Sequence, residues 1–276
     1  MIKAIGVLIG VLSFSGITLA EEQEIYFVGG IYCVSKAIIG IQDGVPKFEM
    51  IGADVICLQV GIAAVSYRDE KLYISTNRKT YVYSAITYKF EYEMGEAGSY
   101  YLQNGDRLYY STLNHDYVLF LAKKNQEPAV LVAGEFSTPS AIYYIGEGNY
   151  IIGQESYMWQ YNEHAYKIQR VNYGCLVLGE IPGKGIVCFD AKKRFISFID
   201  VRGNIEKKCK IPAHVAPRRY LGKLGVVIAQ RTSAGLGWVK GIYEKSTITL
   251  FKIGTGSSCE EYNTGYEQRI NQIAIN

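Results

Sequence analysis

One short segment recurs six times along the chain and constrains the fold more than any other feature. Each copy is a run of β-branched or aromatic residues that follows a turn and precedes a second such run about nine residues later. The copies begin at Ile31, Leu72, Leu108, Tyr150, Ile186 and Val226, and successive starts lie 36 to 42 residues apart, with a mean of 39. This spacing predicts an array of similar β units rather than a helical repeat.

The clearest copy shows how many strands a unit contains. Four strand-like runs, 63–67, 72–76, 81–86 and 88–94, follow one another through short turns, and 88–94 alternates in a way that predicts one packed and one wet face. Four strands at this period are typical of a β-propeller blade. We therefore predict an all-β protein with six four-stranded blades. Seven blades or an irregular β-sandwich remain alternatives, because short, regularly spaced strands also fit sandwiches.

The two ends of the chain have separate predicted roles. Residues 1–20 carry one charge at Lys3, an apolar run and small residues up to Ala20, a pattern typical of a secretory signal peptide. Cleavage after Ala20 leaves residues 21–276 as a single propeller domain. Residues 268–275 alternate like a strand, and we expect them to close the ring by pairing with the first blade, because an open sheet edge invites aggregation. The protein is thus predicted to be secreted or periplasmic.

Charge and hydropathy argue against a nucleic-acid partner and against a membrane-spanning segment. The chain has 29 basic and 26 acidic residues, and no long run of like charge indicates a nucleic-acid partner. The basic clusters 192–194 and 217–219 are expected in solvated turns. Beyond the signal peptide, no stretch is apolar for long enough to span a membrane. The 24 tyrosines favour half-buried strand positions, or an outer recognition face.

The six cysteines predict disulfide bonds. An even number in an exported protein favours disulfides over free thiols, and the spacings contain no CxxC or zinc motif. Cys175 and Cys188 lie symmetrically about the turn at 182–183, which places them opposite each other on adjacent strands, and we expect them to pair. The other pairings are left open, and no metal site is predicted.

Motifs of catalysis and cofactor binding are absent from the sequence. There is no G-x-S-x-G nucleophile elbow, and the glycine pair at 254–256 lacks the strand–helix context of a dinucleotide site. The three histidines, His115, His164 and His214, fall at different positions within their units and do not form a set of metal ligands. We expect no cofactor.

Two groups of residues are candidates for binding. Polar residues near the recurring segments, which would line the axial funnel, are Ser75, Ser111, Asp190 and Gln230, although hydrogen bonds within their own blades would also explain them. Aromatic residues that would form a stacking platform for a sugar or peptide are Tyr157, Trp159, Tyr161 and Trp238, with packing between blades as the alternative.

These observations favour an exported, non-catalytic propeller that binds a protein partner or an extracellular ligand. The alternative is a hydrolase or lyase that acts on a carbohydrate or peptide through acid–base residues gathered at the axis, since members of such a site come from distant positions and form no motif. A third interpretation assigns binding to a tyrosine-rich outer face.

Overall fold

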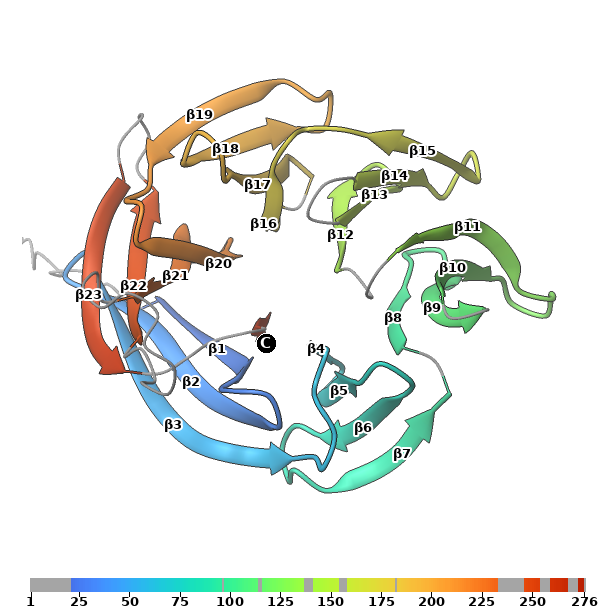
Figure 1. The fold of residues 1–276 in the computed structure, drawn as a ribbon, viewed down its shortest axis with the longest axis horizontal. Coiled ribbons are helices and arrows are strands. Elements are labelled where there is room, and N and C mark those ends of the chain that lie inside the picture. Colours follow the sequence, from blue (N-terminus) through green and yellow to red (C-terminus); the bar gives the residue numbers. More distant parts are fainter. Residues whose placement is uncertain are drawn as a thin grey trace, which may run out of the picture.

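The chain folds as a ring of six antiparallel sheets. The computed structural model describes residues 21–95, 97–113, 116–136, 141–153, 158–181, 183–232, 246–253, 259–267 and 273–275. Within these residues there are 24 strands and no helix, and the strands form six sheets of four around a central axis (Figure 1). The prediction of a six-bladed β-propeller is confirmed. No helix in the described part of the chain has the length and apolarity needed to cross a membrane.

Each sheet is one blade, and its four strands follow one another from the axis outward. Blade 1 consists of β24 (Ile273–Ile275), β1 (Glu21–Val28), β2 (Cys33–Gln42) and β3 (Val45–Cys57). Blade 2 consists of β4 (Ala64–Arg68), β5 (Lys71–Ser75), β6 (Thr80–Ser84) and β7 (Phe90–Met94). Blade 3 consists of β8 (Ala97–Tyr101), β9 (Arg107–Leu113), β10 (Asp116–Ala122) and β11 (Ala129–Phe136). Blade 4 consists of β12 (Ile142–Gly146), β13 (Asn149–Gly153), β14 (Met158–Asn162) and β15 (Lys167–Val171). Blade 5 consists of β16 (Leu176–Ile181), β17 (Gly185–Asp190), β18 (Phe195–Asp200) and β19 (Ile205–Lys210). Blade 6 consists of β20 (Val215–Leu221), β21 (Val226–Thr232), β22 (Ser246–Ile253) and β23 (Cys259–Glu267).

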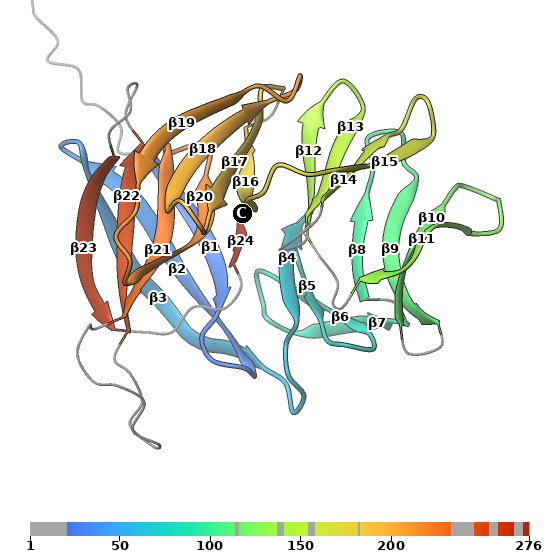
Figure 2. The same cartoon turned by 45° about the horizontal axis from the view of Figure 1, so that its top comes forward.

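The two ends of the described chain meet in blade 1. Strand β24 is the innermost strand of that blade and pairs antiparallel with β1, with Ile273 opposite Phe27 and Ile275 opposite Ile25. Figure 2 shows β24 beside β1 near the centre of the ring. One blade is therefore built from both ends of the sequence, so backbone pairing closes the ring at its junction.

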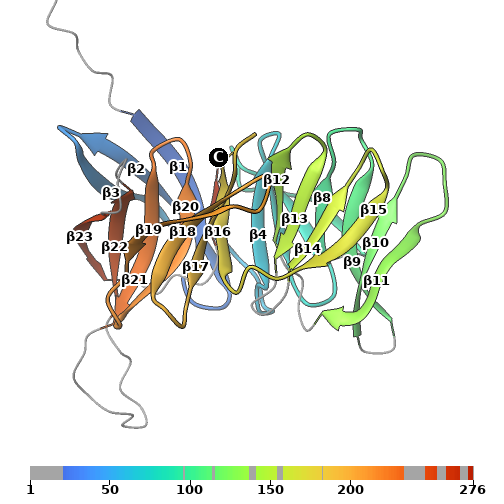
Figure 3. The ribbon, with the colours of Figure 1, turned by 90° about the horizontal axis from the view of Figure 1, so that it is seen from above.

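Most of the core lies between blades rather than inside any one of them. Residues with less than a tenth of their surface exposed form five apolar clusters, at the junctions of blades 1 and 2, 3 and 4, 4 and 5, 5 and 6, and 6 and 1. The cluster between blades 6 and 1 joins Phe27 and Ile273 to Ile228 and Leu250. Successive blades stand side by side around the ring (Figure 3), and each buries its faces against its neighbours.

The junction of blades 2 and 3 differs from the other five. None of the apolar clusters of the described residues spans it. Its contacts include the hydroxyl of Tyr117, which donates to the carbonyl of Asn77 at 3.0 Å, and the guanidinium of Arg68, which lies 4.7 Å from the centre of the Tyr101 ring. The contacts named here across this junction are therefore polar, whereas each of the other junctions holds one of the five apolar clusters.

Three disulfides connect the six cysteines. Cys33–Cys57 joins β2 to β3, and Cys175–Cys188 joins the start of blade 5 to β17, as expected from the turn between them. Cys209–Cys259 joins the outermost strands of blades 5 and 6 across 50 residues of sequence. The disulfides thus lie in blades 1, 5 and 6, on both sides of the point where the ring closes.

The structure corrects four details of the predicted layout. In blade 1 the recurring segment begins in a turn, because Ile31 and Tyr32 precede β2 and their side chains are about half exposed. In blade 6 the strand-like runs of the sequence predict 247–253 as the fourth strand of the unit, whereas it is the third strand, β22. Strand β7 has no packed face, since Phe90 and Tyr92 are 53% and 42% exposed, because an outermost strand is covered on one edge only. Residues 217–219 lie inside β20 and not in a turn.

Ring closure by β24 should contribute measurably to stability. A chain that ends at Glu267 loses the pairing with β1 and the burial of Ile273, which costs roughly 2 kcal/mol or more. For a domain of this size that lowers Tm by about 4 °C or more, measured by circular dichroism. The matched control lacks only Asn276. If both truncated proteins have the same Tm as the intact protein, β24 does not close the ring.

The longest disulfide loop should matter most to stability. Replacing Cys209 and Cys259 together by serine opens a 50-residue loop, which costs about 4 kcal/mol from chain entropy, against about 3 kcal/mol for Cys175 and Cys188 with their 13-residue loop. Unfolding in guanidinium chloride of the two double variants measures this order. A larger loss for the Cys175 and Cys188 pair would contradict it.

Candidate functional site

The four polar residues that the sequence proposes for the funnel lie one strand away from the axis. Ser75, Ser111, Asp190 and Gln230 occupy β5, β9, β17 and β21, which are the second strands of their blades. Ser75 shares a 2.8 Å hydrogen bond with Thr80, and Gln230 accepts one from Arg218 at 3.1 Å. The Asp190 carboxylate accepts the N–H of Lys193 at 2.9 Å in the following turn. These contacts are made within single blades, and the structure does not bring the four together.

The proposed aromatic platform is only partly described. Tyr157 and Trp238 lie outside the described residues. Trp159 is half-buried in β14, and the ring of Tyr161 is fully buried, with its centre 6.3 Å from that of Tyr150. Among the described residues, then, this strand places its aromatic side chains against neighbouring strands rather than in solvent.

A different set of polar side chains converges at one end of the axis. It comes from the innermost strands of blades 2 to 6, which run in the same direction because each is the first strand of a repeated antiparallel unit. We call this set the axial mouth, and its members are Arg68 of β4, Tyr100 and Tyr101 of β8, Tyr144 of β12, Glu180 of β16 and Arg219 of β20. Most of them lie near the carboxyl ends of their strands.

Electrostatic interactions show that the mouth spans the axis. Burial raises the pKa of the Tyr100 hydroxyl well above its usual range, the charge of Glu180 raises it further, and Arg68 and Arg219 oppose that rise. Tyr100 belongs to blade 3, whereas Glu180 and Arg219 belong to blades 5 and 6, which are not its neighbours in the ring. These side chains therefore interact across the axis and not along a blade junction.

Glu180 and Arg219 form the charged centre of the mouth. Burial raises the pKa of the Glu180 carboxyl, and the Arg219 guanidinium and the backbone N–H of Tyr144 partly offset that rise. Arg219 donates from Nη1 to the hydroxyl of Tyr143 at 3.0 Å and lies over the Tyr143 ring at 5.0 Å. Its Nε is buried and has no hydrogen-bond partner among the described residues.

Irregularities in β16 and β20 set the direction of the Glu180 and Arg219 side chains. The register of β16 shifts between Val177 and Gly179, and that of β20 shifts between Pro217 and Arg219, so a bulge precedes each charged residue. Bulges re-aim the side chains that follow them. At Gly179 a Cβ would come within 2.8 Å of the Tyr220 carbonyl oxygen, so only glycine allows β16 and β20 to approach so closely.

A cavity opens beside the mouth at the polar junction of blades 2 and 3. It has a volume of about 290 Å³ and is lined by Arg68, Asp69, Lys71, Tyr73 and Tyr101. Arg68 donates from Nε to Asp69 at 3.2 Å, and Lys71 pairs with Glu91 at 2.8 Å. Because the charges nearly cancel and a tyrosine ring is 40% exposed, the cavity suits a polar ligand that exchanges hydrogen bonds and stacks on a ring.

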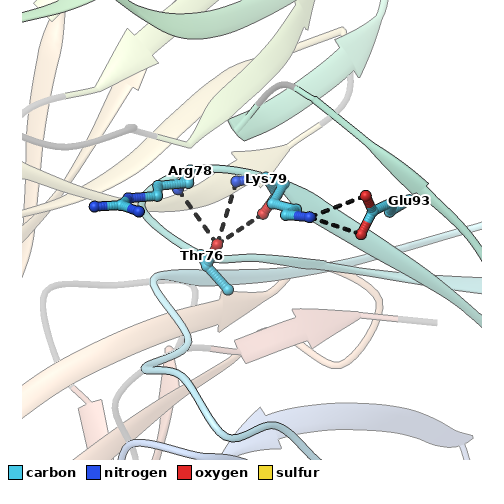
Figure 4. Close-up of polar contacts among 4 residues, drawn as sticks. All are labelled: Thr76, Arg78, Lys79 and Glu93. Atoms are coloured by element: carbon cyan, nitrogen blue, oxygen red, sulfur yellow. Dashed lines mark hydrogen bonds and ion pairs between the residues drawn. The ribbon is translucent and has the colours of Figure 1, made fainter.

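The opposite end of blade 2 carries a rigid turn. The hydroxyl of Thr76 accepts the N–H groups of Arg78 and Lys79 at 3.3 and 3.2 Å and donates to the Lys79 carbonyl at 3.0 Å. Lys79 also pairs with Glu93 at 2.9 Å (Figure 4). Figure 4 shows the side chain of Arg78 pointing away from this network, and the residue is exposed.

One further cluster has the composition of a metal site but not its chemistry. Side-chain atoms of Cys33, Asp54 and Cys57 lie within 4.8 Å of one another. The two sulfurs are joined in a disulfide, so they cannot bind a metal as thiolates.

The axial mouth was not predicted from the sequence, because the second strand of each unit served as the reference, whereas the mouth is built from the first strand. A signal existed for Glu180, which is a charged residue within an otherwise apolar run. Arg219 gave no such signal, because it adjoins Arg218 in a basic cluster.

Comparisons with known proteins establish the fold alone. No protein-family model and no curated protein matches the sequence. The chain is similar to the solved structure of a putative TolB from Agrobacterium tumefaciens, at 10% identity over 91% of each chain and a TM-score of 0.54. It is also similar to a catalytically inactive variant of virginiamycin B lyase from Staphylococcus aureus with quinupristin, at 14% identity over 89% of each chain and a TM-score of 0.51.

The raised pKa of Glu180 predicts a pH dependence of stability. A carboxyl whose pKa is higher in the folded than in the unfolded chain stabilises the fold below the unfolded value of 4.5, and this contribution is lost as pH rises through the folded value. The stability advantage of the intact protein over Glu180→Gln should therefore shrink as pH rises from 4 towards 7, in urea unfolding at a series of pH values. A difference that stays constant or grows over this range would contradict the prediction.

Proposed function

We propose that the protein is an exported, non-catalytic propeller that binds a protein partner or an extracellular ligand at the axial mouth. The observation that carries this proposal is the convergence of polar and aromatic side chains from five innermost strands at one end of the axis. Concave sites with a few convergent polar groups are the usual binding sites of such folds. The tyrosines supply contact area at low entropic cost, and Arg219 supplies donors.

Export is supported by the disulfides. All six cysteines are paired, and disulfides persist in oxidising compartments such as the periplasm or the extracellular space. The signal peptide expected at residues 1–20 lies outside the described residues, and cleavage after Ala20 remains part of this proposal.

Site-specific photo-crosslinking tests where binding occurs. A benzophenone amino acid at Tyr101, in the mouth, should yield covalent adducts in the native envelope or secreted fraction. The matched control is Tyr92 on the outer strand β7, which is 42% exposed against 40% for Tyr101. Adducts at position 101 and not at 92 support the mouth. Adducts at 92 alone would instead place binding on the outer face, and equal yields at both positions would contradict a specific site.

An enzyme is the second candidate, because Glu180 combines a raised pKa with neighbouring tyrosines. A hydrolase or lyase for a carbohydrate or peptide would use Glu180 to donate a proton. Among the described residues of the mouth it is the single carboxylate, so an acid–base pair of carboxylates is not assembled there. Turnover of a glycan or peptide that is lost in Glu180→Gln, together with no adduct at position 101, would favour this candidate over the binding protein.

A further inference from the structure

Two buried carboxylates between blades 3 and 4 have no cationic partner. Asp106 is 8% exposed and Glu163 is 4% exposed. In the described part of the chain, their side chains accept from a backbone N–H, an asparagine amide and a tyrosine hydroxyl, and no lysine, arginine or histidine is among their partners. Buried charges in proteins are normally paired or bound to a metal ion, because an isolated one is costly.

The turn after β8 holds the two carboxylates close to each other. Glu163 accepts at Oε2 from the hydroxyl of Tyr150 at 3.0 Å and from the backbone N–H of Asn104 at 3.4 Å. The side-chain amide of Asn104 in turn donates to Oδ2 of Asp106 at 3.1 Å. A single residue therefore contacts both carboxylates.

A third oxygen belongs to the same cluster. Tyr161 is fully buried, and its hydroxyl has no hydrogen-bond partner among the described residues. Tyr161 lies directly opposite Tyr150 in the pairing of β13 with β14, and the Tyr150 hydroxyl donates to Glu163. The charges of Asp106 and Glu163 add to the burial that raises the pKa of the Tyr161 hydroxyl. An unpartnered oxygen thus lies beside the two carboxylates.

We propose that a calcium ion binds between blades 3 and 4, held by the carboxylates of Asp106 and Glu163 with the Tyr161 hydroxyl beside them. Carboxylate, hydroxyl and water oxygens are the ligands that Ca²⁺ prefers, and its flexible coordination accepts water in the remaining positions. A softer metal would need a nitrogen or sulfur ligand, and the neighbouring His164 does not supply one. The His164 ring packs against the turn at Gly148, where a Cβ would come within 2.5 Å of His164 Nε2.

The ion would serve the ring by neutralising the buried charge. Extracellular calcium modules bind with Kd values of about 0.1 to 1 mM. The site is independent of the ligand of the axial mouth, although the turn that it fixes, 102–106, begins directly after Tyr101. If no calcium binds at this site, the proposed binding function of the axial mouth is unaffected.

Thermal unfolding of the EDTA-treated protein tests the proposal. Adding 10 mM CaCl₂, against KCl of equal ionic strength, should raise Tm by about 3 °C or more, because an ion that binds only the folded state stabilises it. Glu163→Gln and Asp106→Asn, which keep shape but remove charge, should lose most of this rise. The control Asp200→Asn, which changes a turn carboxylate of blade 5, should keep it.

Terbium luminescence gives a readout that does not require a variant to fold. Tb³⁺ is an oxygen-seeking substitute for Ca²⁺, and the rings of Tyr150 and Tyr161 should sensitise its emission at one ion per chain, with loss of emission when Ca²⁺ displaces it. The proposal is overturned if the intact protein shows neither a Tm rise nor sensitised emission. It is equally overturned if both amide variants keep the full rise, because the ion then binds elsewhere.

Discussion

The pairing of β24 with β1 is the constraint on which the rest of the structure depends. It joins residues some 250 positions apart, turns a row of blades into a ring and buries Ile273 against blade 6. The ring brings Tyr100 of blade 3 within the electrostatic reach of Glu180 and Arg219 of blades 5 and 6. The axial mouth is therefore a property of the ring and not of any single blade.

The apolar clusters, disulfides and polar contacts of the ring lie at different blade junctions. Five junctions are sealed by apolar clusters, and disulfides reinforce blades 1, 5 and 6 around the closure. The junction of blades 2 and 3 carries polar contacts and a cavity instead, and the otherwise apolar junction of blades 3 and 4 buries two carboxylates that have no cationic partner among the described residues. Stability and binding are thus located in different parts of one repeated architecture, and both of these junctions involve blade 3.

The sequence predicted the architecture because strand period and spacing are local properties. The 39-residue recurrence and the alternation within strands depend on neighbours along the chain, so six four-stranded blades followed directly. The mouth could not be predicted in the same way. Glu180 and Arg219, on the neighbouring strands β16 and β20, meet only after a bulge in each strand changes its register, and a one-residue shift moves a side chain to the other face. The exposed face of β7 was missed because the alternation of Phe90 and Tyr92 does not reveal which strand is outermost.

A double-mutant cycle between Tyr100 and Glu180 tests the central claim most directly. Unfolding free energies of the intact protein, Tyr100→Phe, Glu180→Gln and the double variant give the coupling between blades 3 and 5, which are not neighbours in the ring. If the ring brings the two side chains together at the axis, the coupling should be about 0.5 kcal/mol or more, as for residues that interact. Additivity within about 0.5 kcal/mol, as for distant sites, would show that the innermost strands do not converge and would contradict the axial mouth.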